Sequence, residues 1–257
     1  MITTKGTGRL GLSAHLGRGH TFPASSPLFP DFPVTCRNVE SISVLFETDS
    51  DAALELIPAV LDIPKPATAA LNILHIPTSG MGEFYEASLI LDVLYKGEAA
   101  RYNVLQFVTN DMSFALGREA LGSPKKLAHI TLKSEPEGML GIAERPLGHR
   151  ILSLSATLEQ YRPREDATNV VGPSIALRII PRPTGENRRA VAELLSTKSS
   201  WIVREQWVCN VSVSTPTQGG ADDWSVLPRL RILQGMFRIF DDITMFRPQL
   251  LEAWDIE

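Results

Sequence analysis

The chain has 257 residues, a formal net charge of −4 and 44% hydrophobic residues, which suits one large domain or two small ones with a sizeable core. Its acidic balance excludes a basic nucleic-acid-binding surface, and no apolar run approaches the length of a membrane span. Residues 1–20 are rich in glycine and lack the apolar centre of a signal peptide. We therefore expect a cytoplasmic protein that has neither nucleic acid nor a membrane as a partner.

Residue types that bind metals are few and scattered. Cys36 and Cys209 form no CxxC motif and are too few for a disulfide framework, so both are expected to be reduced. The five histidines show neither an HExxH motif nor clustered ligand spacing. We expect no metal and no cofactor.

The N-terminal part of the chain predicts an arm, a strand and a short helix. Residues 1–35 carry early glycines and then four prolines, a pattern typical of an extended, irregular arm. Residues 41–46 alternate polar and apolar side chains and end in an apolar pair, which predicts a largely buried strand. A helix is expected over residues 51–57, with Asp49 or Ser50 as its cap.

The next elements predict a β-rich centre. Residues 69–76 are expected to form a strand, and residues 87–95 and 102–108 a hairpin joined by a Lys-Gly-Glu turn. Asn110 or Asp111 then has the residue type and position of a helix cap.

The C-terminal half predicts a mixture of strands and helices. Apolar runs indicate strands over residues 151–158, 175–180 and 207–214, and helix-like patches occupy residues 188–195 and 228–254. No repeat or clear linker divides the sequence. We therefore predict one domain spanning residues 1–257, of the α+β class but mainly β.

Lys125 and Lys126 are adjacent in an apolar stretch that glycine and proline interrupt. The Gly-Ser-Pro segment at residues 122–124 is expected to end the preceding helix and to place both lysines in a turn. Two ammonium groups roughly 6 Å apart repel each other by roughly 3 kcal/mol at an effective dielectric of about 20, and burial also disfavours the charged forms. Most lysine pairs are solvated surface residues, but a buried pair can supply a neutral amine that attacks carbonyl groups.

The lysine segment resembles a known family signature. Residues 117–128 read Gly-Arg-Glu-Ala-Leu-Gly-Ser-Pro-Lys-Lys-Leu-Ala, which is similar to the active-site segment of the acetoacetate decarboxylase family. Further matches are the strand that ends in Glu47-Thr48-Asp49 and the segments at residues 54–58, 61–66 and 79–86. The resemblance implies an antiparallel β-barrel or cone-like sheet with a few short helices. It also implies a homo-oligomer with a small keto acid as its substrate.

Carried over residue by residue, the resemblance assigns roles to several positions. Lys125 corresponds to the lysine that forms a Schiff base, and Lys126 to the neighbour that disfavours its charged form. Glu86 corresponds to the active-site acid/base. Arg37 lies near the position of the arginine that engages the substrate carboxylate, and Phe84 is an apolar residue expected to exclude water.

Two positions depart from the family pattern. Leu71 stands where the decarboxylases carry a second pocket glutamate, and Ser123 stands where they carry a tyrosine. Both are expected to line the substrate site. A lysine Schiff base supports either decarboxylation of a β-keto acid or a pyruvate-type aldol condensation with dehydration. A non-catalytic relative that only binds small molecules is the third alternative.

Overall fold

The computed structural model describes residue 21 and residues 26–136, 138–163, 172–181, 189–216 and 222–254. Most of the predicted N-terminal arm lies outside these ranges. Residues 26–33 contain no regular element, and the first strand begins at Val34. In the described part of the chain, no helix has the length and apolar character needed to cross a membrane.

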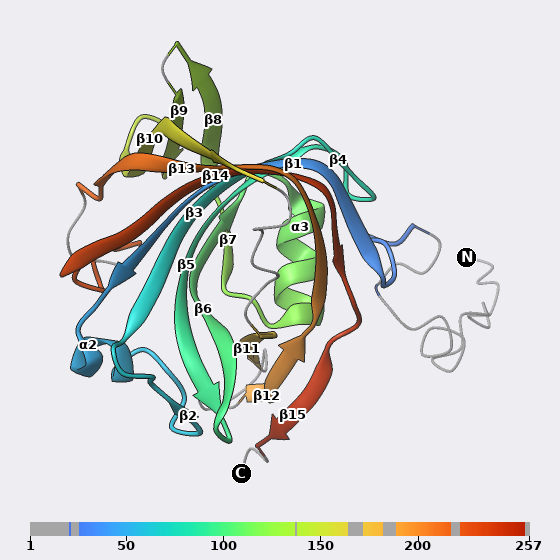
Figure 1. The fold of residues 1–257 in the computed structure, drawn as a ribbon. Coiled ribbons are helices and arrows are strands. Elements are labelled where there is room, and N and C mark those ends of the chain that lie inside the picture. The colour runs from blue at the N-terminus through green and yellow to red at the C-terminus, as the bar shows by residue number, and fades with distance from the viewer. Residues whose placement is uncertain are drawn as a thin grey trace, which may run out of the picture.

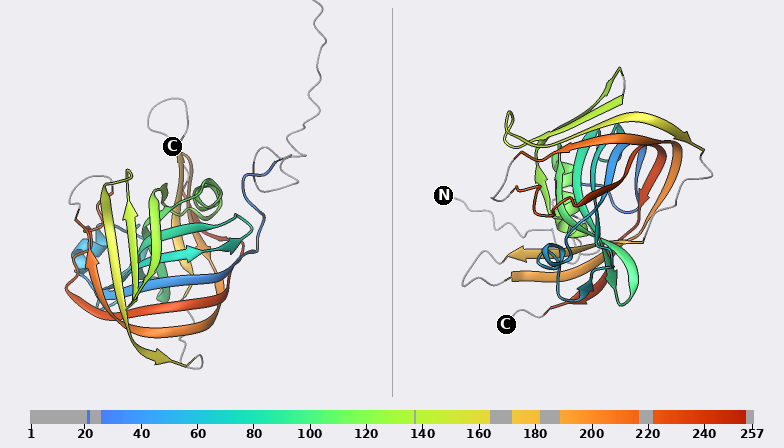
Figure 2. Two further views of the ribbon diagram at one scale, coloured as in Figure 1. Left: turned by 90° about the horizontal axis from the view of Figure 1, so that it is seen from above. Right: turned by 60° about the vertical axis from the view of Figure 1, so that its left-hand side comes forward.

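The described strands join into a single sheet (Figures 1 and 2). Their bounds are β1 Val34–Glu47, β2 Leu61–Asp62, β3 Thr68–Ile76, β4 Thr78–Ser79, β5 Phe84–Tyr95, β6 Glu98–Val108, β7 Lys125–Leu127, β8 His129–Glu135, β9 Gly138–Glu144, β10 Arg150–Arg162, β11 Ser174–Pro181, β12 Arg189–Thr197, β13 Ser199–Ser214, β14 Arg231–Met245 and β15 Gln249–Ala253. The main path runs β15-β12-β11-β6-β5-β3-β1-β14-β13-β10-β9-β8. Pairing is antiparallel except where β6 meets β7 and β11.

The mainly β architecture is confirmed, but the sheet does not close into a barrel. Strands β15 and β8 end the main path on its two sides, so the described ladder is open. Instead, the part of the sheet that contains β9 packs through its side chains against the part that contains β3. A Cβ on Gly141 of β9 would lie 2.8 Å from the Cδ1 atom of Ile73 on β3, so the two layers touch through packing and not through a hydrogen-bonded seam.

Two segments predicted as helical are strands. Residues 188–195 correspond to β12, and residues 228–254 contain β14 and β15. Strand β14 lies between β1 and β13, and apolar residues cover both of its faces: Phe237 belongs to one core and Phe240 to another. A strand buried on both faces lacks the alternation of polar and apolar residues that identifies a strand in a sequence. Its pairing with neighbouring strands therefore determines its conformation.

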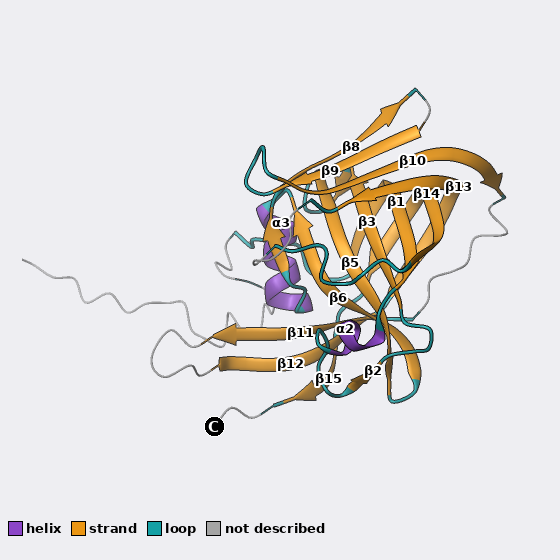
Figure 3. Cartoon of the chain, turned by 90° about the vertical axis from the view of Figure 1, so that its left-hand side faces the viewer, coloured by secondary structure: helices purple, strands orange, loops and turns teal. Residues whose placement is uncertain are grey.

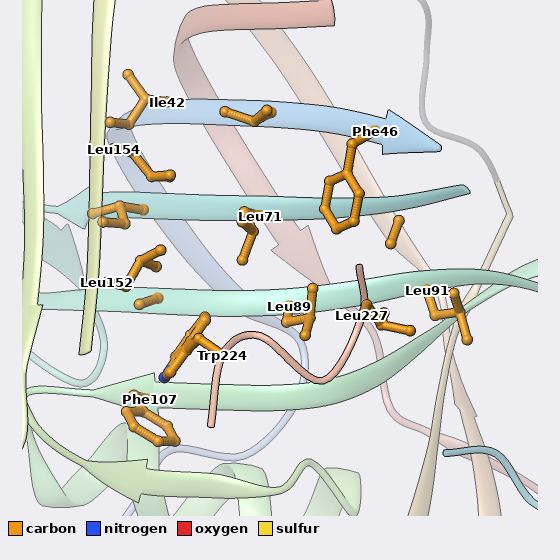
Figure 4. Close-up of a cluster of buried hydrophobic side chains, with 14 of the residues drawn as sticks. Ile42, Phe46, Leu71, Leu89, Leu91, Phe107, Leu152, Leu154, Trp224 and Leu227 are labelled. Atoms are coloured by element: carbon orange, nitrogen blue, oxygen red, sulfur yellow. The ribbon is translucent and has the colours of Figure 1, made fainter. Parts of the chain in front are cut away.

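The apolar side chains form two cores on opposite faces of the sheet. The first core includes Leu71, Leu89 and Phe107 from neighbouring strands, which meet Trp224 from the segment before β14 (Figure 4). The second core lies where the start of β5 meets the helix that follows β6, and it contains Phe84. Each face of the central strands is therefore shielded from water by a different set of residues.

Two short helices begin where the sequence predicts them (Figure 3). Helix α2, Ser50–Leu54, is capped by Asp49, whose Oδ1 accepts a hydrogen bond from the Ala52 backbone at 2.8 Å. Helix α3, Asp111–Ala115, is capped by Asn110 in the same way and continues as a π-helical segment η1, Leu116–Leu121. Helix α3 lies within the curve of the sheet (Figure 1).

The first core predicts the effect of cavity mutations. Leu89 is fully buried, so Leu89→Ala should lower the free energy of unfolding by about 2–5 kcal/mol, because the truncated side chain leaves a cavity. Urea titration followed by circular dichroism measures the loss. Leu147→Ala is the control, since Leu147 is 73% exposed. Equal shifts in the two variants would contradict this packing.

Candidate active site

The short strand β7 positions the lysine pair. It runs parallel to β6, with Lys125 beside Gln106 and Lys126 beside Phe107. The turn predicted for the lysines is therefore wrong, and they belong to a strand. Successive side chains of a strand point to opposite faces. The two ammonium groups consequently enter different surroundings.

Lys125 points to the face covered by α3. Only 4% of the residue is exposed, and its Nζ lies 2.9 Å from the Ser113 hydroxyl and 3.1 Å from Oε2 of Glu86. The second carboxylate oxygen of Glu86 accepts a hydrogen bond from the Gln106 amide at 2.7 Å. The amide oxygen of Gln106 is buried and has no partner among the described residues, which leaves one acceptor at the site. The arrangement combines an amine and an acid in a dry environment.

Close packing by the helix fixes the lysine side chain. Ser113 and Gly117 are four residues apart, a spacing that places them on one helical face. A Cβ on Gly117 would lie 2.3 Å from Cδ of Lys125, so only glycine leaves room for this side chain. Arg118 donates to the Lys125 carbonyl oxygen at 3.3 Å, and Gly122 ends the segment with φ +73°. The interrupted helical geometry thus serves the lysine, as π-helical turns often serve functional sites.

Lys126 lies on the other face, where its charge is balanced. Its Nζ lies 2.6 Å from Asp222 Oδ1 and 5.7 Å from the centre of the Phe107 ring. Arg145 Nε lies 3.0 Å from the second oxygen of Asp222, and Arg145 also donates to the Leu127 carbonyl. Asp222 therefore ties β7 to a distant segment. This geometry does not support the expected repulsion between adjacent lysine ammonium groups.

The pKa of Asp222 reflects this clamp. Burial alone would raise the pKa of the carboxyl group, but hydrogen bonds and charges from Lys126 and Arg145 outweigh it and hold the pKa below its usual value. The carboxylate form is therefore stabilised by its two cationic partners.

Apolar and neutral groups complete the surroundings of Lys125. Phe84, two residues before Glu86 on β5, is buried in the second core beside the helix. The Cys36 thiol is buried on β1, and burial, followed by the negative charge of Glu86, raises its pKa to about 11. Cys36 is thus an uncharged thiol at neutral pH. These groups favour exclusion of water from the amine.

The structure does not gather all the predicted substrate-binding residues. Ser123 is buried in the turn before β7, and its carbonyl oxygen accepts a hydrogen bond from the Lys125 backbone at 2.8 Å. Leu71, in contrast, packs in the first core on the face opposite Glu86. The Arg37 side chain is 67% exposed and lies 3.2 Å from Asp242. Neither Leu71 nor Arg37 therefore lies with Lys125.

Comparison with known proteins agrees with this geometry. The family model described as acetoacetate decarboxylase (ADC) matches residues 20–252. The chain belongs to the acetoacetate decarboxylase family. An acetoacetate decarboxylase of Clostridium botulinum is 27% identical over 199 residues, which cover 76% of this chain and 80% of that protein.

Solved structures with the same fold include two kinds of enzyme. The crystal structure of acetoacetate decarboxylase from Legionella pneumophila has a TM-score of 0.80 at 23% identity and covers 88% of this chain and 90% of its own. The enduracididine biosynthesis enzyme MppR, complexed with the condensation product of pyruvate and imidazole 4-carboxaldehyde, has a TM-score of 0.74 at 17% identity. It covers 92% of this chain and 97% of its own. At these identities the likeness shows the fold alone.

Several residues of this acetoacetate decarboxylase family site were not found from the sequence. Ser113 and Gly117 give a weak sequence signal, because two small residues four positions apart indicate a helical face that allows close packing by another side chain. Gln106 lies on a predicted strand, where the alternation of side chains places it in step with buried positions. Asp222 and Arg145 are distant in sequence from β7 and carried no signal.

The packing of Gly117 predicts a selective loss of lysine reactivity. Gly117→Ala should displace the Lys125 side chain from Ser113 and Glu86, because the added Cβ overlaps it. Trapping of a carbonyl adduct with borohydride, followed by intact mass, should fall at least about tenfold for a misplaced catalytic group. Gly97→Ala is the control, since Gly97 has φ +84° but open space around its Cβ. It should cost some stability and leave adduct formation intact; equal trapping in both variants would refute the overlap.

The Asp222 clamp predicts a pH-dependent stability difference. Asp222→Asn should lower the free energy of unfolding by about 1–3 kcal/mol at pH 7, since it leaves two cations without their carboxylate. The pKa of Asp222 is lower in the folded chain than its usual 3.8, so this stabilisation is present above that value and is lost as the pH falls. Urea titrations at several pH values should show wild type and variant converging in acid. The exposed Asp62→Asn should show no such difference, and a pH-independent gap for Asp222→Asn would contradict the clamp.

Proposed function

We propose that this chain is a Schiff-base lyase that decarboxylates a small β-keto acid at Lys125. The observation that carries the proposal is the buried contact between Lys125 Nζ and Glu86 Oε2 at 3.1 Å. A lysine amine and a carboxyl group in a dry site are the two groups that iminium chemistry requires. Membership of the acetoacetate decarboxylase family supports the same reaction class.

The reaction begins with a proton transfer and a condensation. Glu86 is within hydrogen-bonding reach of Lys125 and can accept the ammonium proton, which frees the nitrogen lone pair. The amine attacks the ketone carbon, and the resulting carbinolamine loses water to form an iminium. The Ser113 hydroxyl, 2.9 Å from Nζ, holds the nitrogen in place during this step.

The iminium then acts as an electron sink. The bond between the α-carbon and the carboxylate breaks, its electron pair moves to the iminium nitrogen, and CO₂ departs to leave an enamine. The first proton on Glu86 leaves with the water lost from the carbinolamine. Glu86, protonated again from solvent, then donates a proton to the enamine carbon, and water hydrolyses the new iminium to release the ketone and the lysine amine. Gln106 fixes the Glu86 carboxyl group during both proton transfers through its 2.7 Å hydrogen bond.

Lys126 has a different role in this scheme from that expected from its sequence position. Its ammonium pairs with Asp222 on the other face of β7. We therefore assign Lys126 to fixing the strand, and the enclosure of Lys125 to keeping bulk water from the reacting nitrogen.

A pyruvate-type aldolase/dehydratase is the second candidate. Ser123 stands where the decarboxylases carry a phenol, so the site has one group fewer to restrict the fate of the enamine. The MppR complex with a condensation product has the same fold. In this alternative the enamine attacks an aldehyde, and Glu86 assists the loss of water.

Borohydride trapping tests the proposed intermediate. The protein is incubated with acetoacetate or pyruvate, reduced, and weighed as an intact chain. We expect a reduced adduct that is absent in Lys125→Ala and retained in the exposed control Lys133→Ala. The absence of any adduct with both keto acids would overturn the Schiff-base assignment. Release of CO₂, compared with formation of an enone when an aldehyde is added, then separates the two candidates.

A further inference from the structure

An arginine on β14 faces the same side of the sheet as the candidate active site. Arg238 pairs with Ser41 on β1, Ser41 pairs with Leu74 on β3, and Leu74 pairs with Glu86 on β5. Residues directly opposite each other in antiparallel strands point to the same face. By this register, the Arg238 side chain lies on the same face of the sheet as Glu86, which contacts Lys125 beside α3.

Arg238 is partly buried without a counter-ion. Among the described residues, no carboxylate forms an ion pair with it, and its hydrogen bond to the Gln206 amide oxygen is long, at 3.5 Å. Gln206 is itself buried and fixed, because its amide nitrogen donates to the Pro163 carbonyl at 3.2 Å. A guanidinium has five N–H donors, so most donors of Arg238 are left for another acceptor.

The nearby acidic groups are already engaged. Glu86 holds Lys125, and Asp92 accepts from Thr68 at 2.6 Å and lies 3.6 Å from Arg101. Burial lowers the pKa of the Arg238 guanidinium, and the positive charge of Arg101 lowers it further. Asp92 pairs with Arg101 and alternates in step with Glu86 along β5, so the Arg101 side chain also lies on the face that carries Glu86 and Arg238.

This arrangement is costly unless an anion completes it. A charge taken from water without a partner destabilises the folded chain, and arginine remains protonated at neutral pH. The planar guanidinium binds a carboxylate through two parallel hydrogen bonds. Arg37, the arginine that the sequence suggested for this role, is largely exposed and paired with Asp242.

We propose that Arg238 binds the carboxylate of the small keto acid whose carbonyl group reacts with Lys125. The proposal rests on the proposed function for the identity of the ligand. Gln206 orients the guanidinium, and Ser41, buried beside it on β1, contributes a small polar surface. Arg238 thereby selects substrates that carry a negative charge over neutral ketones.

Binding of an unreactive carboxylate tests the proposal without Schiff-base chemistry. The probe is 3-hydroxybutyrate, which has a carboxylate but no ketone, and its affinity is measured by isothermal titration calorimetry. Arg238→Met should weaken binding at least about tenfold, because it removes a charge-assisted hydrogen bond. Arg231→Met is the matched control on the same strand, since Arg231 is exposed and paired with Glu47, and it should bind as wild type does.

Thermal unfolding separates a ligand-binding role from a structural one. Replacing an unpaired, partly buried charge by an apolar side chain is expected to leave Tm unchanged or to raise it, whereas loss of a structural contact would lower it. Unchanged affinity in Arg238→Met, loss of affinity in Arg37→Met instead, or no binding by wild type would each overturn the proposal.

The borohydride experiment distinguishes this proposal from the proposed function. If wild type binds 3-hydroxybutyrate through Arg238 but forms no adduct with keto acids, the anion site stands and the Schiff-base function fails. If neutral 4-hydroxy-2-butanone and acetoacetate are both trapped, Arg238→Met should reduce trapping of acetoacetate alone. An equal reduction for both ketones would show that Arg238 does not recognise the carboxylate.

Discussion

The parallel pairing of β7 with β6 is the constraint on which the site depends. It turns two adjacent lysines into residues of opposite faces, so that one is enclosed by α3 and the other meets Asp222. A turn at this position would leave both ammonium groups near each other and near water. The strand instead places one lysine in an enclosed environment and the next in an ion-pair network.

The two faces of β7 also differ in the surroundings of their charged groups. Lys125 is almost fully enclosed, and its Nζ contacts Glu86 and the Ser113 hydroxyl. Lys126 shares Asp222 with Arg145 at a half-exposed position, where charged groups keep part of their hydration. The clamp on the second face restrains β7, and the restraint fixes the Lys125 backbone. The ion-pair clamp and the enclosed amine therefore belong to neighbouring residues that face different environments.

The sequence predicted the local features well and the long-range ones poorly. Asp49 and Asn110 were identifiable as caps because a cap depends on the residues just after it. Glu86 and Lys125 were predicted together because the family pattern includes both, and the structure places their side chains 3.1 Å apart. Strand β14 could not be recognised as a strand, since it is apolar on both faces and its neighbour β1 lies more than 180 residues earlier in the chain. Leu71 was placed with the site by its position in the family pattern, but alternation along β3 turns it toward the first core.

The charges on the α3 side of the sheet also bear on product release. Lys125 has Glu86 and Arg101 has Asp92, whereas Arg238 has no acidic partner among the described residues. A keto acid with one carboxylate would supply the missing charge. Decarboxylation converts that carboxylate to CO₂ and leaves a neutral ketone, which has no charge for Arg238 to hold. An aldol product keeps its carboxylate and would remain bound, so the two candidate reactions differ in the role that Arg238 would have in product release.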